Sequence, residues 1–316
     1  MTTSCCDLSV VLPACDEAAN IAPMCAALGK VLVSLGTSEI IFVDDGSRDD
    51  TLTELRAAAG QEPNLRYLSF TRNFGHQVAL RAGLHHARGR AVILMDADFE
   101  HPPELIPKLV AAWRAGAKVV VTKRDDEDSR LSALKSVTSR LFYRALDTIG
   151  DVRIDPGSSD FMLLDRVVVD RIKAIEDRGI FLRGLVRWLG YPMTTIAFSR
   201  GRRRSGDTKF TLPRMIELAV TGLSAHSLRP LRFAVWLSLV FAAFGGVLLA
   251  YSIVSFVFIQ RTVVGWSSIM GAIAILAAAQ FLVLGIIGEY VGRILRETRR
   301  RPSYIVAETE ADRRGG

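Results

Sequence analysis

Two long segments without a charged residue constrain the fold of this chain more than any other feature. They comprise residues 233–260 and 262–288, and Arg261 alone separates them. Each is longer than the about 20 residues that cross the ~30 Å hydrocarbon core of a bilayer as a helix. Two buried helices of a soluble protein are the alternative, but such helices rarely run so far without an ionisable group. We therefore expect a hairpin of two transmembrane helices, about 233–259 and 266–288, within residues 231–292.

Arginines beside these segments predict how the hairpin is oriented. Most lie at its open end, namely Arg229, Arg232, Arg293, Arg296, Arg299, Arg300 and Arg301, and only Arg261 lies in its loop. Basic residues favour the cytoplasmic side of a membrane. We therefore expect a multi-pass protein of the inner or plasma membrane, with residues 1–211 and a basic tail, 293–316, in the cytoplasm. The N-terminal segment lacks the pattern of a signal peptide, which agrees with a cytoplasmic body.

Residues 212–230 precede the hairpin and mix apolar and polar residues as an amphipathic helix at the membrane interface does. A surface helix of the soluble domain is the alternative, and the basic run near residues 200–214 favours the membrane. The chain has 40 Lys and Arg against 33 Asp and Glu, a net charge of +7. A net positive charge could serve to bind nucleic acid. The basic residues cluster beside the apolar segments, however, where binding to anionic lipid head groups explains their position. We expect membrane lipids and no nucleic acid as partners.

Between residues 8 and 125, short apolar runs alternate with helical patterns. These patterns predict strands at 9–14, 39–47, 65–70, 91–98 and 117–124, and helices at 17–35, 50–60, 75–88 and 103–115. Such alternation is typical of a mostly parallel sheet covered on both faces, which binds ligands outside the carboxyl ends of its strands. The four cysteines, Cys5, Cys6, Cys15 and Cys25, lack the spacing of a zinc site or disulfide framework, so we expect reduced thiols.

Acidic residues follow several of the predicted strands. They are Asp16 and Glu17, then Asp44 and Asp45, and finally Asp96, Asp98 and Glu100. In an extended segment the last three would share one face. Three carboxylates repel each other unless a cation lies among them, and hard oxygen ligands suit Mg²⁺ or Mn²⁺. A solvated strand end without metal is the alternative. The apolar strand before these residues and the proline-initiated helix after them favour the metal.

Basic residues provide a complement to this acidic edge. Arg72, Arg124 and the run from Arg200 to Arg204 with Lys209 are candidate phosphate ligands. The sequence contains neither the G-x-G-x-x-G turn of dinucleotide-binding domains nor a Walker A loop. A divalent ion held by carboxylates, together with these cations, predicts a phosphorylated donor.

In their order along the chain, these motifs resemble those of the family-2 glycosyltransferases that act on polyprenyl phosphates, the dolichyl-phosphate mannosyltransferase-like and bactoprenol glucosyltransferase-like group. The resemblance extends from about residue 8 to residue 304 and rests on VVLPACDEAANI, IIFVDDGSRDDT, TRNFGHQVALRAGL, MDADFEHPPELIP, DPGSSDFMLLDR and RGRRRSGDTKF. It implies a GT-A fold, in which a Rossmann-like, mostly parallel sheet binds a nucleotide sugar. It also implies a homo-oligomer, a tetramer in this family. Processive synthases resemble this domain too, but the Gln of their Q-x-x-R-W motif is missing from residues 184–188.

The resemblance assigns roles to residues motif by motif. It implies nucleotide-sugar contacts for Pro13, Glu17, Asp44, Asp45, Asp96 and Arg124, metal ligation for Asp96, Asp98 and Glu100, a catalytic carboxylate at Asp160, and phosphate or acceptor contacts for Arg200, Arg203 and Lys209. Three positions depart from the family pattern: Cys15-Asp16 replaces Tyr-Asn, Glu100 replaces Gln, and Met162 replaces Arg.

The implied reaction transfers a hexose from a UDP- or GDP-sugar to a polyprenyl phosphate, either undecaprenyl or dolichyl phosphate. Inversion at the sugar would give a β-linked product for cell-envelope glycan or lipid modification, with Mg²⁺ or Mn²⁺ as cofactor. Two alternatives remain open at this point. The chain could act on another membrane glycolipid, or it could be a non-catalytic membrane scaffold that retains the GT-A domain.

Overall fold

A computed structural model describes residues 6–124, 158–175, 182–198, 240–241, 243–247, 254, 266–299 and 301–311. The chain divides into two compact units. The first comprises residues 1–143, 152–210 and 302–316, and the second comprises residues 144–151 and 211–301. The described part of the first unit contains a sheet with its covering helices, and that of the second contains one long helix.

One sheet of eight strands organises the first unit, in the order β7-β5-β6-β4-β1-β2-β3-β8. The strands are β1 (Leu8–Ala14), β2 (Ser38–Asp44), β3 (Leu65–Phe70), β4 (Ala91–Leu94), β5 (Val119–Arg124), β6 (Ser158–Asp165), β7 (Met193–Phe198) and β8 (Val306–Thr309). Strands β6 and β8 run antiparallel to the other six. The prediction of a mostly parallel, Rossmann-like α/β sheet is therefore confirmed.

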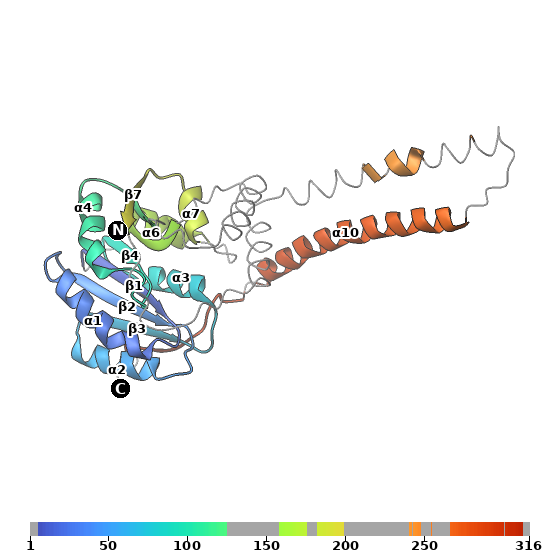
Figure 1. The fold of residues 1–316 in the computed structure, drawn as a ribbon. Coiled ribbons are helices and arrows are strands. Elements are labelled where there is room, and N and C mark those ends of the chain that lie inside the picture. Colours follow the sequence, from blue (N-terminus) through green and yellow to red (C-terminus); the bar gives the residue numbers. More distant parts are fainter. Residues whose placement is uncertain are drawn as a thin grey trace, which may run out of the picture. The chain divides into compact units, whose positions relative to one another are not determined.

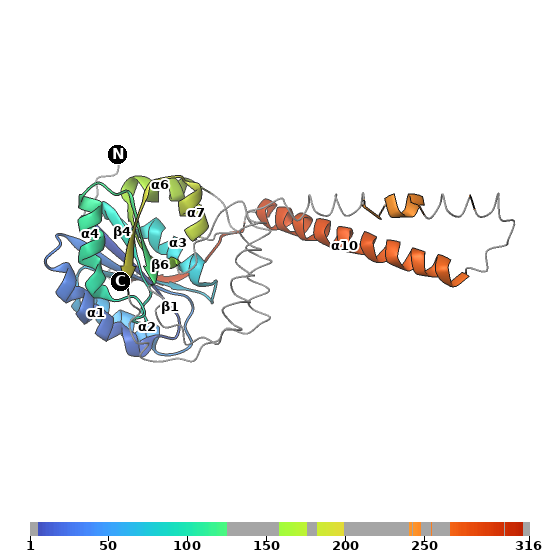
Figure 2. The same ribbon diagram turned by 45° about the horizontal axis from the view of Figure 1, so that its top comes forward.

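Helices cover both faces of this sheet (Figures 1 and 2). One face packs against α1 (Ala18–Leu32), α2 (Thr51–Gln61), the 3₁₀ turn η1 (Pro103–Leu105) and α4 (Ile106–Arg114). The other face packs against α3 (His76–His86), α6 (Arg166–Ala174) and α7 (Leu182–Trp188). In β1 the buried side chains alternate between these two cores, with Val10 and Leu12 on one side and Val11 on the other. A strand apolar on both faces therefore occupies the centre of the sheet.

Two expectations from the sequence need correction. The strand predicted at 91–98 ends at Leu94, and Phe99 has a φ of +65°, so the acidic residues after β4 do not continue an extended segment. The residues expected to form a basic tail, 293–316, begin inside a helix that ends at Thr298 and then return to the sheet as β8, antiparallel to β3. The short polar sequence of β8 gives no apolar run that would predict a strand. Within the described residues, Cys6, Cys15 and Cys25 form no disulfide.

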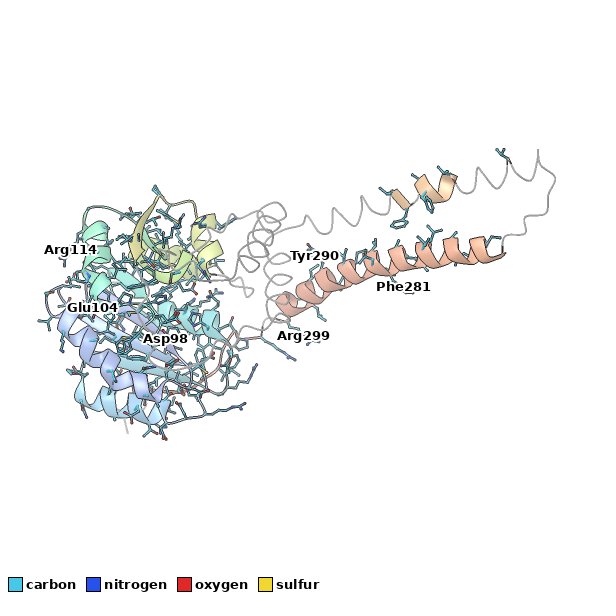
Figure 3. The ribbon with its side chains drawn as sticks, viewed as in Figure 1. Asp98, Glu104, Arg114, Phe281, Tyr290 and Arg299 are labelled. Atoms are coloured by element: carbon cyan, nitrogen blue, oxygen red, sulfur yellow. The ribbon has the colours of Figure 1, made fainter. Side chains whose placement is uncertain are left out.

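The second unit contains α10 (Trp266–Thr298), a helix of 33 residues. Its segment Ile275–Gly292 is long and apolar enough to cross a membrane, judged by length and composition, and it is the one such segment among the described residues. Apolar side chains lie exposed along it; Phe281, labelled in Figure 3, is 73% exposed. Most of the other expected span, 233–259, and all of residues 212–230 lie outside the described residues, so the hairpin stays a prediction here.

Close packing between α3 and β1 gives the first testable prediction. A Cβ at Gly83 would lie 2.2 Å from Val11 Cγ1. Val11 is fully buried and β-branched, so it has no free rotamer to move into. We expect Gly83→Ala to destabilise the chain by about 1–3 kcal/mol through overpacking, seen as a lower melting temperature in detergent.

Gly60 in α2 is the matched control, because no atom lies within 4 Å of a Cβ placed there. Gly60→Ala should be neutral or should stabilise the chain by up to about 1 kcal/mol, because alanine favours a helix over glycine. Equal melting temperatures for the two variants would contradict the close packing of α3 on β1.

Candidate functional site

Two buried acids end strand β2 and bind the backbone of neighbouring loops. The Asp44 carboxylate accepts hydrogen bonds from Ser47 N at 3.0 Å and Ser69 Oγ at 2.7 Å. The Asp45 carboxylate accepts from Phe74 N at 2.6 Å and Gly75 N at 2.9 Å. Burial raises the pKa of Asp45, and the charge of the adjacent Asp44 raises it further. The hydrogen bonds from the two backbone amides act in the opposite direction and lower this pKa. Asp45 therefore fixes the loop that leads into α3.

This loop, residues 71–75, packs against the turn after β2. Gly46 has a φ of +66°, and a Cβ there would lie 2.4 Å from the carbonyl carbon of Arg72. Only glycine therefore permits the approach of these two backbones. On its other side the loop reaches the end of β1, where Asn73 Nδ2 lies 3.2 Å from Cys15 Sγ. The loop thus borders the carboxyl ends of β1 and β2.

At the end of β1 the sequence-predicted residues are held mainly by backbone contacts. Proline has no backbone N–H to donate to a neighbouring strand. The nitrogen of Pro13 faces β4 beyond the last pair of β1 and β4, Val11–Leu94, so no hydrogen bond of the sheet is lost. Asp16 has a φ of +59°, and its carboxylate accepts from Arg48 N at 2.7 Å. Glu17 N donates to Thr51 Oγ1 at 2.8 Å.

The register of β4 and β6 brings Asp96 and Asp160 together. These strands are antiparallel and pair Leu94 with Met162. Asp96 follows Leu94 by two residues and Asp160 precedes Met162 by two, so the two acids come to the same end of the strand pair. His76, the first residue of α3, lies between them, with Nε2 3.5 Å from Asp96 Oδ1 and 3.6 Å from Asp160 Oδ2.

Asp160 has further polar neighbours. Arg183 Nε of α7 lies 2.9 Å from Asp160 Oδ1, and Gln77 Nε2 donates to Oδ2 at 3.3 Å. Gln77 is itself oriented by Leu182 N, which donates to its Oε1 at 3.0 Å. Helices α3 and α7 therefore both hold this carboxylate.

The environment separates the pKa values of the two acids. Burial raises the pKa of Asp96, and the nearby charges of Asp160 and Asp98 raise it further. His101 and His76 act in the opposite direction and lower this pKa. Burial also opposes ionisation of Asp160, but His76, Arg183 and Gln77 outweigh it and hold the pKa of Asp160 below its usual range. For His76, too, burial is outweighed by these carboxylates, which raise its pKa. The same contacts therefore shift Asp160 towards its ionised form and His76 towards its protonated form.

A buried histidine connects the segment after β4 with β6. Asp96 N donates to His101 Nδ1 at 2.9 Å, so Nε2 carries the proton and donates to Ser159 Oγ at 2.6 Å. His101 is 1% exposed and its ring stacks on Phe161 with the centroids 5.1 Å apart. His101 therefore fixes the backbone of Asp96 relative to the residue before Asp160.

The residues after β4 fit a divalent cation in part. Among the described residues, no three His, Cys, Asp or Glu side chains converge as metal ligands, so ligation of a metal by Asp96, Asp98 and Glu100 stays a prediction. Glu100 is buried, at 5% exposed, and its N–H donates to Asp98 Oδ1 at 2.9 Å; Asp98 is labelled in Figure 3. Asp96 Oδ1, in contrast, is buried and accepts no hydrogen bond in the described part of the chain, and the His76 ring lies 3.5 Å from it. A buried oxygen in this state suits a cation.

Other predicted residues lie outside the described structure. These are Arg200, Arg203 and Lys209, and for Arg124 the backbone at the end of β5 is described but the side chain is not. Sequence reasoning missed His76, Gln77, His101, Ser159 and Arg183. The first two lie at the start of the helix predicted at 75–88, several residues after the strand predicted at 65–70, so a search of strand ends alone did not reach them. Met162, which departs from the family pattern, lies in the core at 1% exposed.

Comparison with known proteins supplies the family. The model described as "Glycosyl transferase family 2" matches residues 9–173, and that described as "GtrB C-terminal hairpin" matches residues 229–294. The uncharacterized glycosyltransferase YkcC of Bacillus subtilis is 35% identical over 305 residues, which cover 95% of this chain and 93% of that protein. A prophage bactoprenol glucosyl transferase homolog of Escherichia coli K12 is 38% identical over 268 residues, 85% of this chain and 87% of that one.

A bactoprenol glucosyl transferase of Shigella phage SfV is 37% identical over 268 residues, which cover 85% of this chain and 87% of that one. Among solved structures, mannosyl-3-phosphoglycerate synthase from Rubrobacter xylanophilus has a TM-score of 0.50 at 16% identity, covering 70% of this chain and 72% of that one. At this identity the structural likeness supports the fold alone.

The contact between His101 and Ser159 gives the second prediction. His101→Phe keeps an aromatic ring against Phe161 but leaves the Ser159 hydroxyl and the Asp96 amide without their partner. Each of His101→Phe and Ser159→Ala should lower the free energy of unfolding by about 1–3 kcal/mol. In the double variant the two losses should fall short of additivity by about 1 kcal/mol.

Ser69→Ala serves as the control partner for His101→Phe, because Ser69 bonds to Asp44, whereas His101 bonds to the Asp96 amide and to Ser159. That pair should be additive within about 0.5 kcal/mol in chemical unfolding curves. Full additivity of His101→Phe with Ser159→Ala would contradict the link.

Proposed function

This chain belongs to glycosyl transferase family 2, and on that premise we propose that it transfers a sugar from a nucleotide sugar to the phosphate of a polyprenyl phosphate. The observation that carries the proposal is the meeting of Asp96 and Asp160 around His76, at the carboxyl ends of the parallel strands. Ligands of such sheets bind at this edge. Relatives named as bactoprenol glucosyl transferases support the choice of a polyprenyl phosphate as the acceptor.

The donor would lie across the ends of β1 and β2. Its nucleoside would contact the segment from Pro13 to Glu17 and the turn after Asp45, and its diphosphate would approach Asp96 and Asp98. Asp96 Oδ1, buried without a hydrogen-bond partner in the described residues, would hold Mg²⁺ or Mn²⁺ there together with Asp98. When bound, this ion would offset charge on the leaving diphosphate.

Asp160 would act on the sugar as an ionised carboxylate. Its lowered pKa makes it a weak base, but the acceptor needs little help, because a phosphate monoester has its second pKa near ~6 and is mostly a dianion at pH 7. Arg183 and Gln77 hold the carboxylate in one orientation. We infer that Asp160 stabilises positive charge at the anomeric carbon while a phosphate oxygen of the acceptor bonds to that carbon. It attacks from the side opposite the breaking bond to the nucleoside diphosphate, which leaves, so that an α-linked donor gives a β-linked product.

Residues 231–292 would anchor this site at the membrane as a hairpin, with the catalytic domain in the cytoplasm. Support comes from the two uncharged segments, from the exposed apolar side chains of α10 and from the match of residues 229–294 to a family of C-terminal hairpins. Arg203 and Lys209 would bind the acceptor phosphate or the donor diphosphate near the membrane surface, and the chain would assemble as a homo-oligomer.

A donor and acceptor panel tests the proposed function. Purified chain in detergent is incubated with UDP- and GDP-sugars and with undecaprenyl phosphate, dolichyl phosphate or diacylglycerol, and products are read by mass spectrometry. We expect a polyprenyl phosphate to be glycosylated in the presence of Mn²⁺ or Mg²⁺ and no product in EDTA. Asp98→Ala should be inactive but folded. Transfer to diacylglycerol alone would favour a glycolipid-modifying enzyme, and full activity after dialysis against EDTA would contradict the metal.

Arg203 and Lys209 give a further prediction. If each contacts a phosphate in the transition state, Arg203→Ala and Lys209→Ala should each lower kcat/KM for the lipid phosphate by about 10²–10³, or roughly 2.7–4 kcal/mol. If they only attract anionic lipid, each contributes about 1 kcal/mol to membrane affinity and activity in detergent should hardly change. Arg171→Ala, in the last turn of α6, is the matched control. A loss under about threefold in both variants would exclude the phosphate contact.

A further inference from the structure

We propose that the segment following α10, residues 301–311, positions loop 71–75 at the border of the proposed nucleoside site, and that Tyr304 is its principal positioning residue. Loop 71–75 borders the expected nucleoside site, so this inference deepens the proposed function. The expected effect of Tyr304 on donor affinity rests on that proposed function. Its structural part, the support of the loop by Tyr304, stands on contacts within the first unit alone.

Tyr304 and its neighbours contact the chain where β3 passes into this loop. The Tyr304 ring stacks on Phe70, the last residue of β3, with the centroids 5.0 Å apart and the planes inclined by 22°. Thr71 N donates to Ile305 O at 3.1 Å, so the first amide of the loop is bound by the returning chain. Burial raises the pKa of the Tyr304 hydroxyl, which agrees with a ring enclosed against the sheet.

From Phe70 the contacts continue to the acid at the end of β2. Phe70 contacts Phe74 edge to face, with the ring centroids 5.7 Å apart. The Arg72 guanidinium lies over the Phe74 ring, 4.1 Å from its centroid. The Phe74 and Gly75 amides then bind Asp45. Tyr304 is thus separated from Asp45 by two aromatic residues, and removing its ring would free Phe70 and Phe74 to move.

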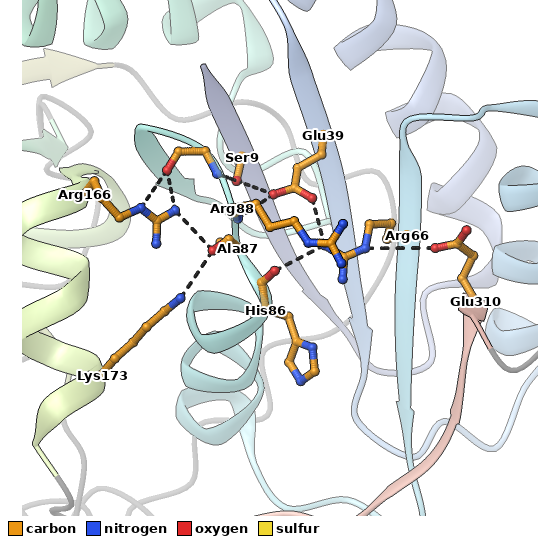
Figure 4. A network of polar contacts seen from close by, with 10 residues as sticks. Ser9, Glu39, Arg66, His86, Ala87, Arg88, Arg166, Lys173 and Glu310 are labelled. Carbon is orange, nitrogen blue, oxygen red and sulfur yellow. Dashed lines mark hydrogen bonds and ion pairs between the residues drawn. The ribbon is translucent and has the colours of Figure 1, made fainter. Parts of the chain in front are cut away.

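Other contacts fasten β8 at the opposite end, away from the loop. Arg56 forms an ion pair with Glu308, which also accepts a hydrogen bond from the Tyr67 hydroxyl. Beyond β8, Glu310 lies 4.0 Å from Arg66, whose guanidinium also pairs with Glu39 at 2.8 Å (Figure 4). These ties can hold β8 in place after a change at Tyr304, so a local effect on the loop can be separated from loss of the strand.

Hydrogen–deuterium exchange in the full chain tests the structural part without any ligand. The Phe74 and Gly75 amides report on their bonds to Asp45, and we expect Tyr304→Ala to speed their exchange at least tenfold. Tyr304→Phe keeps the ring and should stay within twofold of the unmodified chain. Glu310→Gln, at the far end of the segment, is the matched control and should also stay within twofold. If Tyr304→Ala fails to fold, Tyr304→Leu replaces it, with faster exchange again expected.

Binding of UDP and GDP, measured by calorimetry with Mn²⁺, tests the functional part. For whichever nucleotide the unmodified chain binds, Tyr304→Ala should raise Kd at least tenfold and Tyr304→Phe less than twofold. With the matching donor sugar, KM for the donor should rise while kcat changes less than threefold. If the unmodified chain binds neither nucleotide, the proposed function fails and the exchange data alone decide the inference. Unchanged exchange at Phe74 and Gly75 in Tyr304→Ala, or equal acceleration in Glu310→Gln, would overturn it.

Discussion

The contact of His76 with both Asp96 and Asp160 is the interaction on which the arrangement of the site depends. Two carboxylates in one partly buried place repel each other unless positive groups lie between or beside them. His76 and Arg183 supply these groups, and each comes from a different helix on the same face of the sheet. The antiparallel strand β6 is needed because it alone brings Asp160 back to the end of β4. The positions of α3, α7 and β6 follow from this requirement.

His76, Gln77 and the loop before them also connect the two halves of the site. Gly75 binds Asp45 on the side proposed for the nucleoside, and the next two residues contact Asp160 on the side proposed for the sugar. Only one peptide separates Gly75 from His76, so displacement of the loop would disturb both halves. This is a physical reason for the many small constraints on it, from the glycine at position 46 to the aromatic contacts of Phe70 and Phe74.

Much of the fold was predictable from the sequence, because its central strands are apolar on both faces and its helices are regularly spaced. The resemblance to polyprenyl-phosphate glycosyltransferases of family 2, drawn from the order of the motifs, is confirmed by the family match and the relatives. The turn at Phe99 was not predictable, since a positive φ at a non-glycine residue leaves no pattern. Arg183 could not be found either, because its contact with Asp160 depends on how α7 packs.

Strand β8 has a consequence for how the protein is made. The ribosome completes residues 306–309 only after both apolar segments have been synthesised. Until then, β3 presents an unpaired edge of the kind that invites pairing with another chain. A nascent catalytic domain with this open edge is exposed to misassembly during translation. If these segments insert into a membrane as proposed, a stall in their insertion would prolong this vulnerable interval for a domain that is otherwise folded.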